Sequence, residues 1–483
     1  MKKIIINTAL VLLLAAIFTA CSNQSEDQSN QKIVILHTND MHAKIDNMAK
    51  LAAYKQEVEE QYDHVFLVSA GDIFSGNPVV DVYKKKGYPM IDLMNRLGYD
   101  LSAIGNHEFD YGQEILAKRM KQANFQFICA NINTQKTNLP QPKPYVVLEA
   151  DGKKLLFLSL IEVWNDGLPS THPAKLKNIE FQDPVESASK FTKLAKKHDA
   201  FIGLTHLGYR ADKRLAQEHP EFDLIIGGHS HTFLDSAEKV NNTFITQVGD
   251  DINYVGKTVL SFNNDKLTNI HTEAIDLKNY EKENKKIASI IKKYNNNEAL
   301  NAVIGKAENP IRGKEELGAL FTDAQVEVQN LDFAFQNNGG IRIGEIPKGE
   351  IKVKTIYELD PFGNDLVKIE MKPDEIKSLI RSGYQRGNEP NLQIGGGSYT
   401  IHLNDDRELK RITIKNEEGK KLHADSTYEV GLNSYITETY TFDHKDKGES
   451  LYVTTAKNII DFIKEKENID YSGVKRIHVE KAK

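Results

Sequence analysis

Five short apolar runs of the chain each stop at residues that can bind a metal ion. The segment richest in such residues follows the run 101–104. Its sequence is Gly105-Asn106-His107-Glu108-Phe109-Asp110, which offers an amide, an imidazole and two carboxylates. Alone, this segment could be an ordinary loop in which Asn106 caps the next helix and His107 is a hydrogen-bonded loop residue. The other four runs end in the same way, which favours a chemical role. Their ends carry Asp40 and His42, Gly71 and Asp72, His206, and His229 with His231.

The elements that must position these residues follow from the apolar pattern. Strand-like runs cover residues 32–36, 65–68, 101–104, 200–204 and 223–226, and helical composition covers 48–62 and 82–97. This alternation predicts a parallel or mixed sheet flanked by helices, in which ligands bind at the carboxyl ends of the strands. Side chains two apart on an extended chain point the same way, so Asp40 with His42, and His229 with His231, are each expected to reach one cation.

Together the strand ends supply a set of nitrogen and oxygen ligands that suits two metal ions better than one. The set consists of Asp40, His42, Asp72, Asn106, His206, His229 and His231. With one carboxylate bridging, these ligands satisfy two adjacent divalent cations, whereas a single ion would leave several unused. The chain has only two cysteines, Cys21 and Cys129, so a cysteine-rich structural zinc site is excluded.

The second half of the chain has no such cluster but carries groups that suit a phosphate and a base. At 483 residues the chain is too long for one core, and the charged, helical stretch 278–297 predicts a solvated helix between two domains. Beyond it, Arg312 precedes a predicted helix, and a strand leads into Asn337-Asn338-Gly339-Gly340-Ile341-Arg342, where Arg342 can pair with an anion. Phe362 lies on a turn, where an aromatic ring is either a ligand contact or, more commonly, a loop anchor.

Residues 32 to about 280 resemble a calcineurin-like metallophosphatase domain, because the five ligand blocks occur in that superfamily's order. The resemblance implies a four-layer α/β/β/α domain in which Asp40, His42, Asp72 and His231 hold one metal ion, and Asp72, Asn106, His206 and His229 hold the other. It further implies in-line attack by a metal-activated water, with His107 acting near the phosphoryl group or the leaving oxygen and Asp110 orienting it. Asp110 could instead be a helix cap before Tyr111-Gly112.

The second half resembles the C-terminal domain of the 5′-nucleotidase family, through the Asn-x-Gly-Gly-Ile-Arg and Asp-Pro-Phe-Gly blocks. This resemblance implies a second, mixed-sheet α/β domain that binds substrate, with arginines on the phosphate and ribose side, two rings around the base, and rotation of the domains about segment 278–297. The implied substrate residues are Arg312, Asn337, Gly339, Gly340, Arg342, Phe362 and Tyr435. One departure is clear: after Tyr435, the family's Gly-Gly-Asp-Gly block is replaced by a longer loop over residues 441–451.

The N-terminus has the pattern of an export signal. Lys2 and Lys3 precede an apolar run over residues 4–20, and 18–21 resemble a bacterial lipoprotein processing box ending at Cys21, although ordinary cleavage near residue 20 remains an alternative. We therefore expect a signal peptide at 1–20, a tether at 21–31, the metallophosphatase domain at 32–278, a linker helix at 279–297 and the substrate domain at 298–483. A lipid on Cys21 would hold the protein on a membrane, in the periplasm or at the cell surface. Cys129 is expected to be a buried apolar residue.

The predicted function is that of an exported phosphohydrolase with two divalent metal ions, Zn, Mn or Fe, which releases phosphate from nucleoside 5′-monophosphates in nucleotide catabolism. The alternatives are a phosphodiesterase or pyrophosphatase acting on 2′,3′-cyclic nucleotides or nucleotide-sugars, and a surface lipoprotein that binds nucleotides without turnover. A formal net charge of −6, with no basic block, argues against a nucleic-acid polymer as partner.

Overall fold

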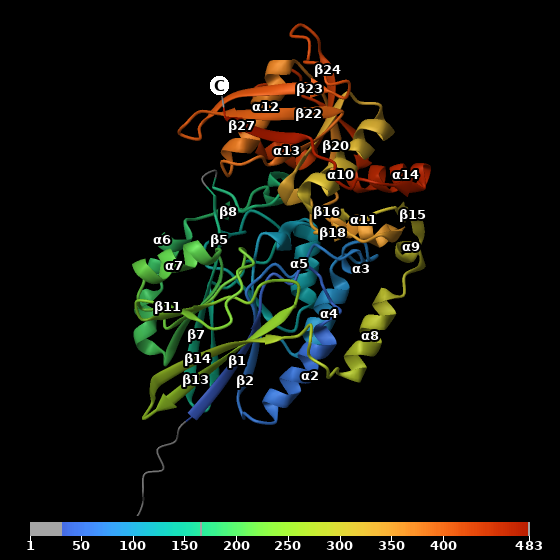
Figure 1. Cartoon of the computed structure of the whole chain (residues 1–483). Coiled ribbons are helices and arrows are strands. Elements are labelled where there is room, and N and C mark those ends of the chain that lie inside the picture. Colours follow the sequence, from blue (N-terminus) through green and yellow to red (C-terminus); the bar gives the residue numbers. More distant parts are fainter. Residues whose placement is uncertain (1–30, 165–166, 482–483) are drawn as a thin grey trace, which may run out of the picture.

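The computed structural model describes residues 31–164 and 167–481, so the predicted signal peptide and nearly all of the predicted tether lie outside the described residues. The chain forms two lobes, with the first lobe (residues 31–301) below and the second lobe (residues 302–481) above in Figure 1. Within the described ranges, no helix combines the length and the apolarity needed to cross a bilayer.

Two six-stranded sheets form the centre of the first lobe. One has the order β14 (Lys266–Asp276), β13 (Tyr254–Asn263), β1 (Gln31–Thr38), β2 (Val65–Ser69), β3 (Leu101–Ala103) and β4 (Gln126–Ile128). The other has the order β11 (Glu238–Val240), β12 (Thr243–Thr246), β10 (Leu224–Ile226), β9 (Ala200–His206), β7 (Lys153–Ile161) and β6 (Tyr145–Ala150). In each sheet four neighbouring strands are parallel, β1 to β4 and β12, β10, β9 and β7, so their carboxyl ends lie together.

The sheets pack face to face and helices cover their outer faces, which confirms the four-layer α/β/β/α prediction. Strand β1 shows why its sequence is apolar throughout: Ile33 and Ile35 face the core between the sheets, whereas Val34 and Leu36 face the core under the helices. The helices are α2 (Met48–Glu59), α3 (Pro78–Asp81), α4 (Tyr88–Leu97) and α5 (Gln113–Gln122) beside the first sheet, and α6 (Pro184–Ser189) and α7 (Tyr209–Glu218) beside the second.

Short elements complete the first lobe. The helix predicted over 82–97 begins only at Tyr88, because Gly87 has a left-handed backbone (φ 75°) and Pro89 favours the first turn of a helix. The remaining pieces are the 3₁₀ helices η1 (His107–Phe109), η2 (Pro173–Leu176) and η3 (Thr192–Lys197), and the paired strands β5 (Ile132–Asn133) and β8 (Glu180–Phe181). Cys129 is buried, as expected, and is a free cysteine.

The linker helix differs from its prediction. Helix α8 (Lys285–Asn295) lies along the first lobe, in yellow in Figure 1, and is not solvated on all sides. Its Ile287 and Ile291, one turn apart, enter the core of the first lobe, and Tyr294 donates to Asp92 Oδ2 at 2.9 Å. Helix α9 (Glu298–Asn301) places Leu300 in the same core. The abundant lysines of this segment obscured an apolar stripe at helical spacing.

The second lobe is a mixed-sheet α/β unit with two cores. Its main sheet has the order β21 (Leu392–Gly395), β17 (Phe333–Asn337), β24 (Tyr428–Asn433), β20 (Asp365–Met371) and β25 (Glu449–Thr454). Smaller sheets join β19 (Gly349–Lys352), β15 (Val303–Ala307) and β26 (Asn468–Ile469); β23 (Leu409–Asn416), β22 (Gly397–Leu403) and β27 (Ile477–Lys481); and β16 (Ile311–Arg312) with β18 (Glu345–Ile346). The helices are α10 (Gly313–Gln329), α11 (Val353–Leu359), α12 (Pro373–Gln385), α13 (Ser434–Thr439) and α14 (Thr455–Lys466), with the 3₁₀ turn η4 (Asn338–Gly340). Helix α11 contacts α3 and α9, which joins the lobes.

Candidate active site

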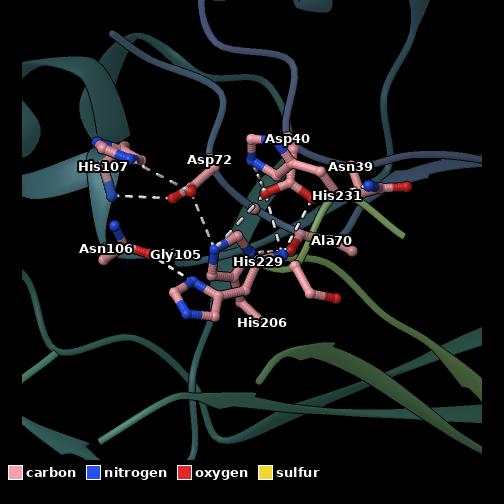
Figure 2. Close-up of polar contacts among 12 residues, drawn as sticks. Asn39, Asp40, Ala70, Asp72, Gly105, Asn106, His107, His206, His229 and His231 are labelled. Atoms are coloured by element: carbon pink, nitrogen blue, oxygen red, sulfur yellow. Dashed lines mark hydrogen bonds and ion pairs between the residues drawn. The ribbon is translucent and has the colours of Figure 1, made fainter. Parts of the chain in front are cut away.

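All seven predicted ligand residues lie together in the first lobe, at the carboxyl ends of parallel strands from both sheets. Figure 2 labels six of them, all except His42. Asp40, His42 and His231 have ligand atoms within 4.8 Å of one another, and so do Asp72, His206 and His229. Asn106 joins the second group, because its Oδ1 lies 3.0 Å from His229 Nδ1. The structure therefore brings these seven residues together, and their division into two ligand sets stays a prediction.

Asp72 lies between the two groups. Its Oδ2 is 3.0 Å from His206 Nε2, and its Oδ1 accepts the backbone N–H of His107 at 2.8 Å. Asp72 also forms a close group with His42 and His107. Although burial opposes ionisation, the imidazoles of His206 and His107 hold the pKa of Asp72 well below its usual value. A buried carboxylate of this kind is suited to bridging two cations.

The ligand pairs come together through left-handed backbone, which corrects the prediction that they lie on extended strands. Strand β1 ends at Thr38 and β10 at Ile226, before either pair begins. The φ angles are 47° at Asp40, 44° at His42, 53° at Asp72, 79° at His229 and 52° at His231. Residues other than glycine seldom adopt this left-handed region of the backbone. Where they do, they cluster at functional sites that the surrounding structure holds in place.

The orientation of the imidazoles fits a bound cation. His42 Nδ1 faces the carbonyl of Ser75 at 3.2 Å and His231 Nδ1 faces Asp250 Oδ2 at 3.1 Å, so in the neutral rings each Nδ1–H donates and each Nε2 carries a lone pair. The two Nε2 atoms nevertheless lie 3.0 Å apart. Burial lowers the pKa of both rings, but Asp250 and Asp40 raise that of His231, so a protonated His231 can donate to His42 Nε2. A carbonyl or carboxylate behind the ring is also the usual support of a metal-binding histidine.

His206 repeats this arrangement at the second group. Its Nδ1 donates to the carbonyl of Ala70 at 2.8 Å, which turns Nε2 toward Asp72. Burial lowers the pKa of His206, but Asp72 and Asp40 more than offset this and raise it well above the usual value. The donors at both groups are therefore imidazole nitrogens and carboxylate oxygens aimed at common points, a set that fits Zn, Mn or Fe.

Two glycines and one carboxylate support the ligands at close range. A Cβ on Gly105 would lie 2.3 Å from Asp72 Oδ1, and a Cβ on Gly228 would lie 2.8 Å from His206 Nδ1, so any side chain at either position would displace a ligand. Glu108 is fully buried and accepts the backbone N–H groups of Asp72, Ile73 and Gly105. Burial and the neighbouring Asp72 raise the pKa of Glu108 to about 7.

His107 and Asp110 form a hydrogen-bonded pair at the edge of the ligand cluster. Asp110 Oδ2 accepts from His107 Nδ1 at 2.7 Å. Burial disfavours the charged form of both groups, but their mutual attraction outweighs it. Asp110 raises the pKa of His107, and His107 lowers the pKa of Asp110. The alternative role of Asp110 as a helix cap is not realised, because α5 begins after Gly112.

The sequence did not point to Glu162, which lies beside the second ligand group. It follows β7, the neighbour of β9, and its Oε1 is 4.0 Å from His229 Nδ1. Glu162 Oε1 accepts the N–H of Ser170 at 2.8 Å, and burial raises its pKa to about 8. Glu162 has no ligand-type neighbour in the sequence, so only the pairing of β7 with β9 reveals it.

A cavity of about 150 Å³ opens beside His107 and Asp110, between the two lobes. The second lobe lines it with six of the seven predicted substrate residues: Asn337, Gly339, Gly340, Arg342, Phe362 and Tyr435. Arg312 is the exception, because it does not line this cavity. Its side chain lies on the edge strand β16, is 65% exposed, and pairs with Glu345 at 3.3 Å, because β16 turns it toward solvent and the partner strand β18.

Arg342 and Phe362 join the second lobe to the ligand cluster. The Phe362 ring is nearly parallel to that of His107, with centroids 5.6 Å apart, and the Arg342 guanidinium lies 5.6 Å from the Phe362 centroid. Arg342 Nη2 lies 3.3 Å from His42 Nε2. Phe362 is therefore part of the cavity wall and is more than the loop anchor that its turn position alone suggests.

Beneath the cavity, an amide network fixes Asn337. Asn433 Nδ2 donates to Gln336 Oε1 at 2.7 Å and to Asn337 Oδ1 at 3.0 Å. A Cβ on Gly340 would lie 2.0 Å from Gln336 Nε2, so packing against this network requires glycine at that position.

The altered loop after Tyr435 is anchored away from the cavity. Asp443 N donates to Ser378 Oγ at 3.0 Å and Lys445 N donates to Glu375 Oε1 at 2.9 Å, which ties the loop to α12. Tyr435 itself remains in the cavity wall.

Two family models match the chain: the calcineurin-like phosphoesterase over residues 33–233, and the 5′-nucleotidase C-terminal domain over residues 301–441. A 5′-nucleotidase of Vibrio cholerae is 26% identical over 505 residues, covering 90% of this chain and 89% of that protein. The trifunctional nucleotide phosphoesterase protein YfkN of Bacillus subtilis is 27% identical over 469 residues, and this chain spans only 32% of its length. The crystal structure of a 5′-nucleotidase precursor from Thermus thermophilus superimposes with a TM-score of 0.80 at 25% identity, covering 94% of this chain and all of that one.

Proposed function

Since the chain belongs to the 5′-nucleotidase family and is a metal-dependent phosphoester hydrolase, we propose that it releases phosphate from nucleoside 5′-monophosphates with the help of two divalent cations. The observation that carries this proposal is the cavity walled by Phe362 and Tyr435, which opens at His107 beside the ligand cluster. Aromatic rings stack on any base, so we expect broad acceptance of nucleotides. Membership of a hydrolase family, with a complete set of ligands, argues against a binding protein without turnover.

In this proposal, Asp40, His42, Asp72 and His231 hold one cation, and Asp72, Asn106, His206 and His229 hold the other. When bound, the cations polarise the phosphoryl oxygens and lower the pKa of a water molecule to about 7. The spacing of the ligands is fixed by Asp72, which both sets share, and by the left-handed backbone at Asp40, His42, Asp72, His229 and His231.

The remaining residues bind and orient the substrate. His107, held by Asp110, faces the cluster and can donate a hydrogen bond or a proton at the phosphoryl group or the leaving oxygen. Arg342, whose guanidinium reaches His42, can pair with the phosphate. Asn337, Gly339 and Gly340 form the floor of the cavity, and Phe362 and Tyr435 receive the base. Because α8 and α9 pack on the first lobe, we place the pivot for motion between the lobes at Ala302, beyond the predicted linker helix.

A second candidate function is supported by a further cavity on the other side of Arg342. This cavity, of about 220 Å³, is lined by charged side chains of both lobes, among them Lys44, Asp250, Asp251 and Lys314, and it reaches His42 and His231. A phosphodiester or pyrophosphate carries a second substituent on the reacting phosphorus, and this polar cavity could receive it. The arrangement therefore favours nucleotide-sugars as alternative substrates; a 2′,3′-cyclic nucleotide, whose two ester oxygens belong to one ribose, has no second group for this cavity and is tested alongside them.

The test is hydrolysis by the full-length protein reconstituted with Zn, Mn or Fe, followed as phosphate release for the monoesters and as formation of the nucleoside monophosphate for UDP-glucose and 2′,3′-cyclic AMP. The substrates are AMP, UMP, UDP-glucose, 2′,3′-cyclic AMP and p-nitrophenyl phosphate, each with and without a chelator. Chelator-sensitive turnover that is fastest with the 5′-monophosphates is expected. Faster turnover of a cyclic or sugar nucleotide would transfer the function to the second candidate, and no turnover with any metal would refute both.

We also propose that the protein is exported and anchored to a membrane through a lipid on Cys21. The support for this is the signal-like segment, residues 1–20, which lies outside the described residues. Cys21→Ala expressed in a bacterial host is expected to move the protein from the membrane fraction to the soluble fraction and to abolish labelling with a fatty acid. Membrane retention of the unlabelled variant would contradict the anchor.

A further inference from the structure

The hydroxyl of Thr171 contacts the carboxylate that orients His107. Thr171 Oγ1 donates to Asp110 Oδ1 at 3.0 Å, while the other carboxylate oxygen, Oδ2, accepts from His107 Nδ1. Thr171 is 6% exposed and lines the cavity beside both residues. The three side chains therefore form a continuous hydrogen-bonded line, Thr171 to Asp110 to His107, that ends at the ligand cluster.

The segment that carries Thr171 is fixed at several further points to the loop of residues 105–110 and to α5. The carbonyl of Ser170 accepts from Asn106 Nδ2 at 3.0 Å, and Lys175 Nζ donates to the carbonyl of Asp110 at 2.5 Å. Gln113 Nε2 in turn donates to the carbonyl of Lys175 at 3.0 Å. Because these contacts hold the backbone on both sides of Thr171, its hydroxyl is presented to Asp110 in one place.

A second donor changes what the Asp110 carboxylate can do. Without the Thr171 hydroxyl on Oδ1, the carboxylate could rotate more freely and move its lone pairs away from the imidazole N–H, and the hydrogen bond would weaken steeply with angle. A donor on the opposite oxygen fixes the plane of the carboxylate, and supports of this kind decide how accurately an active-site group is placed.

We propose that Thr171 is a positioning residue for the reaction: its hydroxyl fixes Asp110, and Asp110 in turn orients His107 toward the phosphoryl group. This inference rests on the proposed function, in which His107 acts during phosphoryl transfer. It assigns a role to a residue outside the ligand blocks and outside the loop of residues 105–110.

The first test compares Thr171→Val with Thr171→Ser in the metal-loaded, full-length protein. Thr171→Val removes the donor at nearly constant volume, and we expect kcat with AMP to fall about tenfold to a hundredfold while KM stays within about twofold. Thr171→Ser keeps the donor and should retain kcat within about threefold. Metal content, measured by mass spectrometry, should equal that of the wild type in both variants.

The matched control is Thr243→Val. Thr243 is fully buried and donates to the carbonyl of Phe222 at 2.7 Å, within the second sheet region and away from the site. This variant loses a comparable buried hydrogen bond, so it should lower the melting temperature and leave kcat unchanged. Equal losses of kcat in Thr171→Val and Thr243→Val would overturn the proposal, because they would mean that stability alone explains the effect.

A double-mutant cycle separates a positioning role from an independent one. If Thr171 acts only through Asp110, adding Thr171→Val to Asp110→Asn should change kcat by less than about twofold. Effects that multiply would overturn the proposal, and so would a loss of metal in parallel with kcat. If Thr171→Val does not fold, Thr171→Ala takes its place in the same cycle.

The outcome is independent of the identity of the substrate. If the wild type fails to hydrolyse AMP, the proposed nucleotidase function is refuted, and the cycle is then measured with p-nitrophenyl phosphate. A non-additive cycle with that substrate would still support the role of Thr171.

Discussion

Replacing Asp72 with asparagine should separate the two metal sites from the rest of the fold. Asp72 is 1% exposed, its Oδ2 lies 3.0 Å from His206 Nε2, and its Oδ1 accepts the N–H of His107. Asparagine keeps the size of the side chain and one oxygen for His107, so the main loss is the negative charge shared by the two ligand sets. We therefore expect both cations to bind more weakly while the backbone stays in place.

The size of the effect follows from linkage. A cation present at about 100 times its dissociation constant stabilises the folded state by about 2.7 kcal/mol, so two sites contribute about 5 kcal/mol. For a lobe of this size that corresponds to a shift of about 10 to 20 °C in the melting temperature. Loss of a supporting contact behind a ligand already costs about tenfold to a hundredfold in activity or affinity, so loss of the shared ligand should lower kcat by at least about a thousandfold.

The assay combines thermal unfolding with and without chelator, metal content, and phosphate release from AMP. Chelator should lower the melting temperature of the wild type by the full amount and that of Asp72→Asn by less than half as much. The control is Asp323→Asn in the second lobe, where Asp323 pairs with Arg476 at 2.5 Å. It should reduce stability but change neither the chelator effect nor kcat. An Asp72→Asn protein with normal metal content and kcat within about tenfold of the wild type would refute the reasoning.

Three further predictions concern the cavity, the ligand loop and a buried histidine. Phe362→Ala should raise KM for AMP by about fivefold to a hundredfold, the value of one stacked ring, and change KM for p-nitrophenyl phosphate much less; equal changes for both substrates would argue against base stacking. Gly105→Ala places a Cβ 2.3 Å from Asp72 Oδ1 and should lose metal and activity together. The control Gly387→Ala, whose Cβ would contact only Glu389 at 3.6 Å, should behave as the wild type. A fully metallated Gly105→Ala protein would contradict this prediction. His37 is fully buried and burial lowers its pKa to about 3, so below pH 6.5 the unfolded chain binds a proton that the folded chain does not. Stability is therefore lost as pH falls. In chelator-treated protein, His37→Leu should reduce the drop in the free energy of unfolding between about pH 7.5 and about pH 5 by about 2 kcal/mol, as measured by urea denaturation. An unchanged drop would show that His37 is not buried as a neutral ring.

The sequence alone was enough to identify the family and to predict a ligand set. Parallel strands are buried on both faces, so they appear as short apolar runs, and a ligand residue directly after such a run must lie at the sheet edge where substrates bind. Asp40, Asp72, Asn106, His206 and His229, from widely separated parts of the chain, all follow such runs. The blocks around Arg342 and Phe362 likewise predicted which side of the second lobe faces the site.

Local patterns were less successful wherever conformation depends on packing. Arg312 matched a family position, but the β16 and β18 pairing turns it to solvent. The lysine-rich linker appeared solvated, but Ile287 and Ile291 bury one face of α8. The Asp-x-His and His-x-His pairs suggested extended chain, whereas the ligands use left-handed backbone that no spacing rule reveals.

Glu162, Thr171 and the second cavity beside Arg342 emerged only in three dimensions. Glu162 approaches His229 because β7 pairs with β9, and Thr171 reaches Asp110 because the segment after β7 folds back on the loop after β3. The sequence determined which groups are available and at which strand ends they lie. The tertiary structure decided which of them meet, because contacts between distant segments depend on how the sheets pack and how the lobes close. Local patterns along the sequence reveal neither the packing of the sheets nor the closure of the lobes.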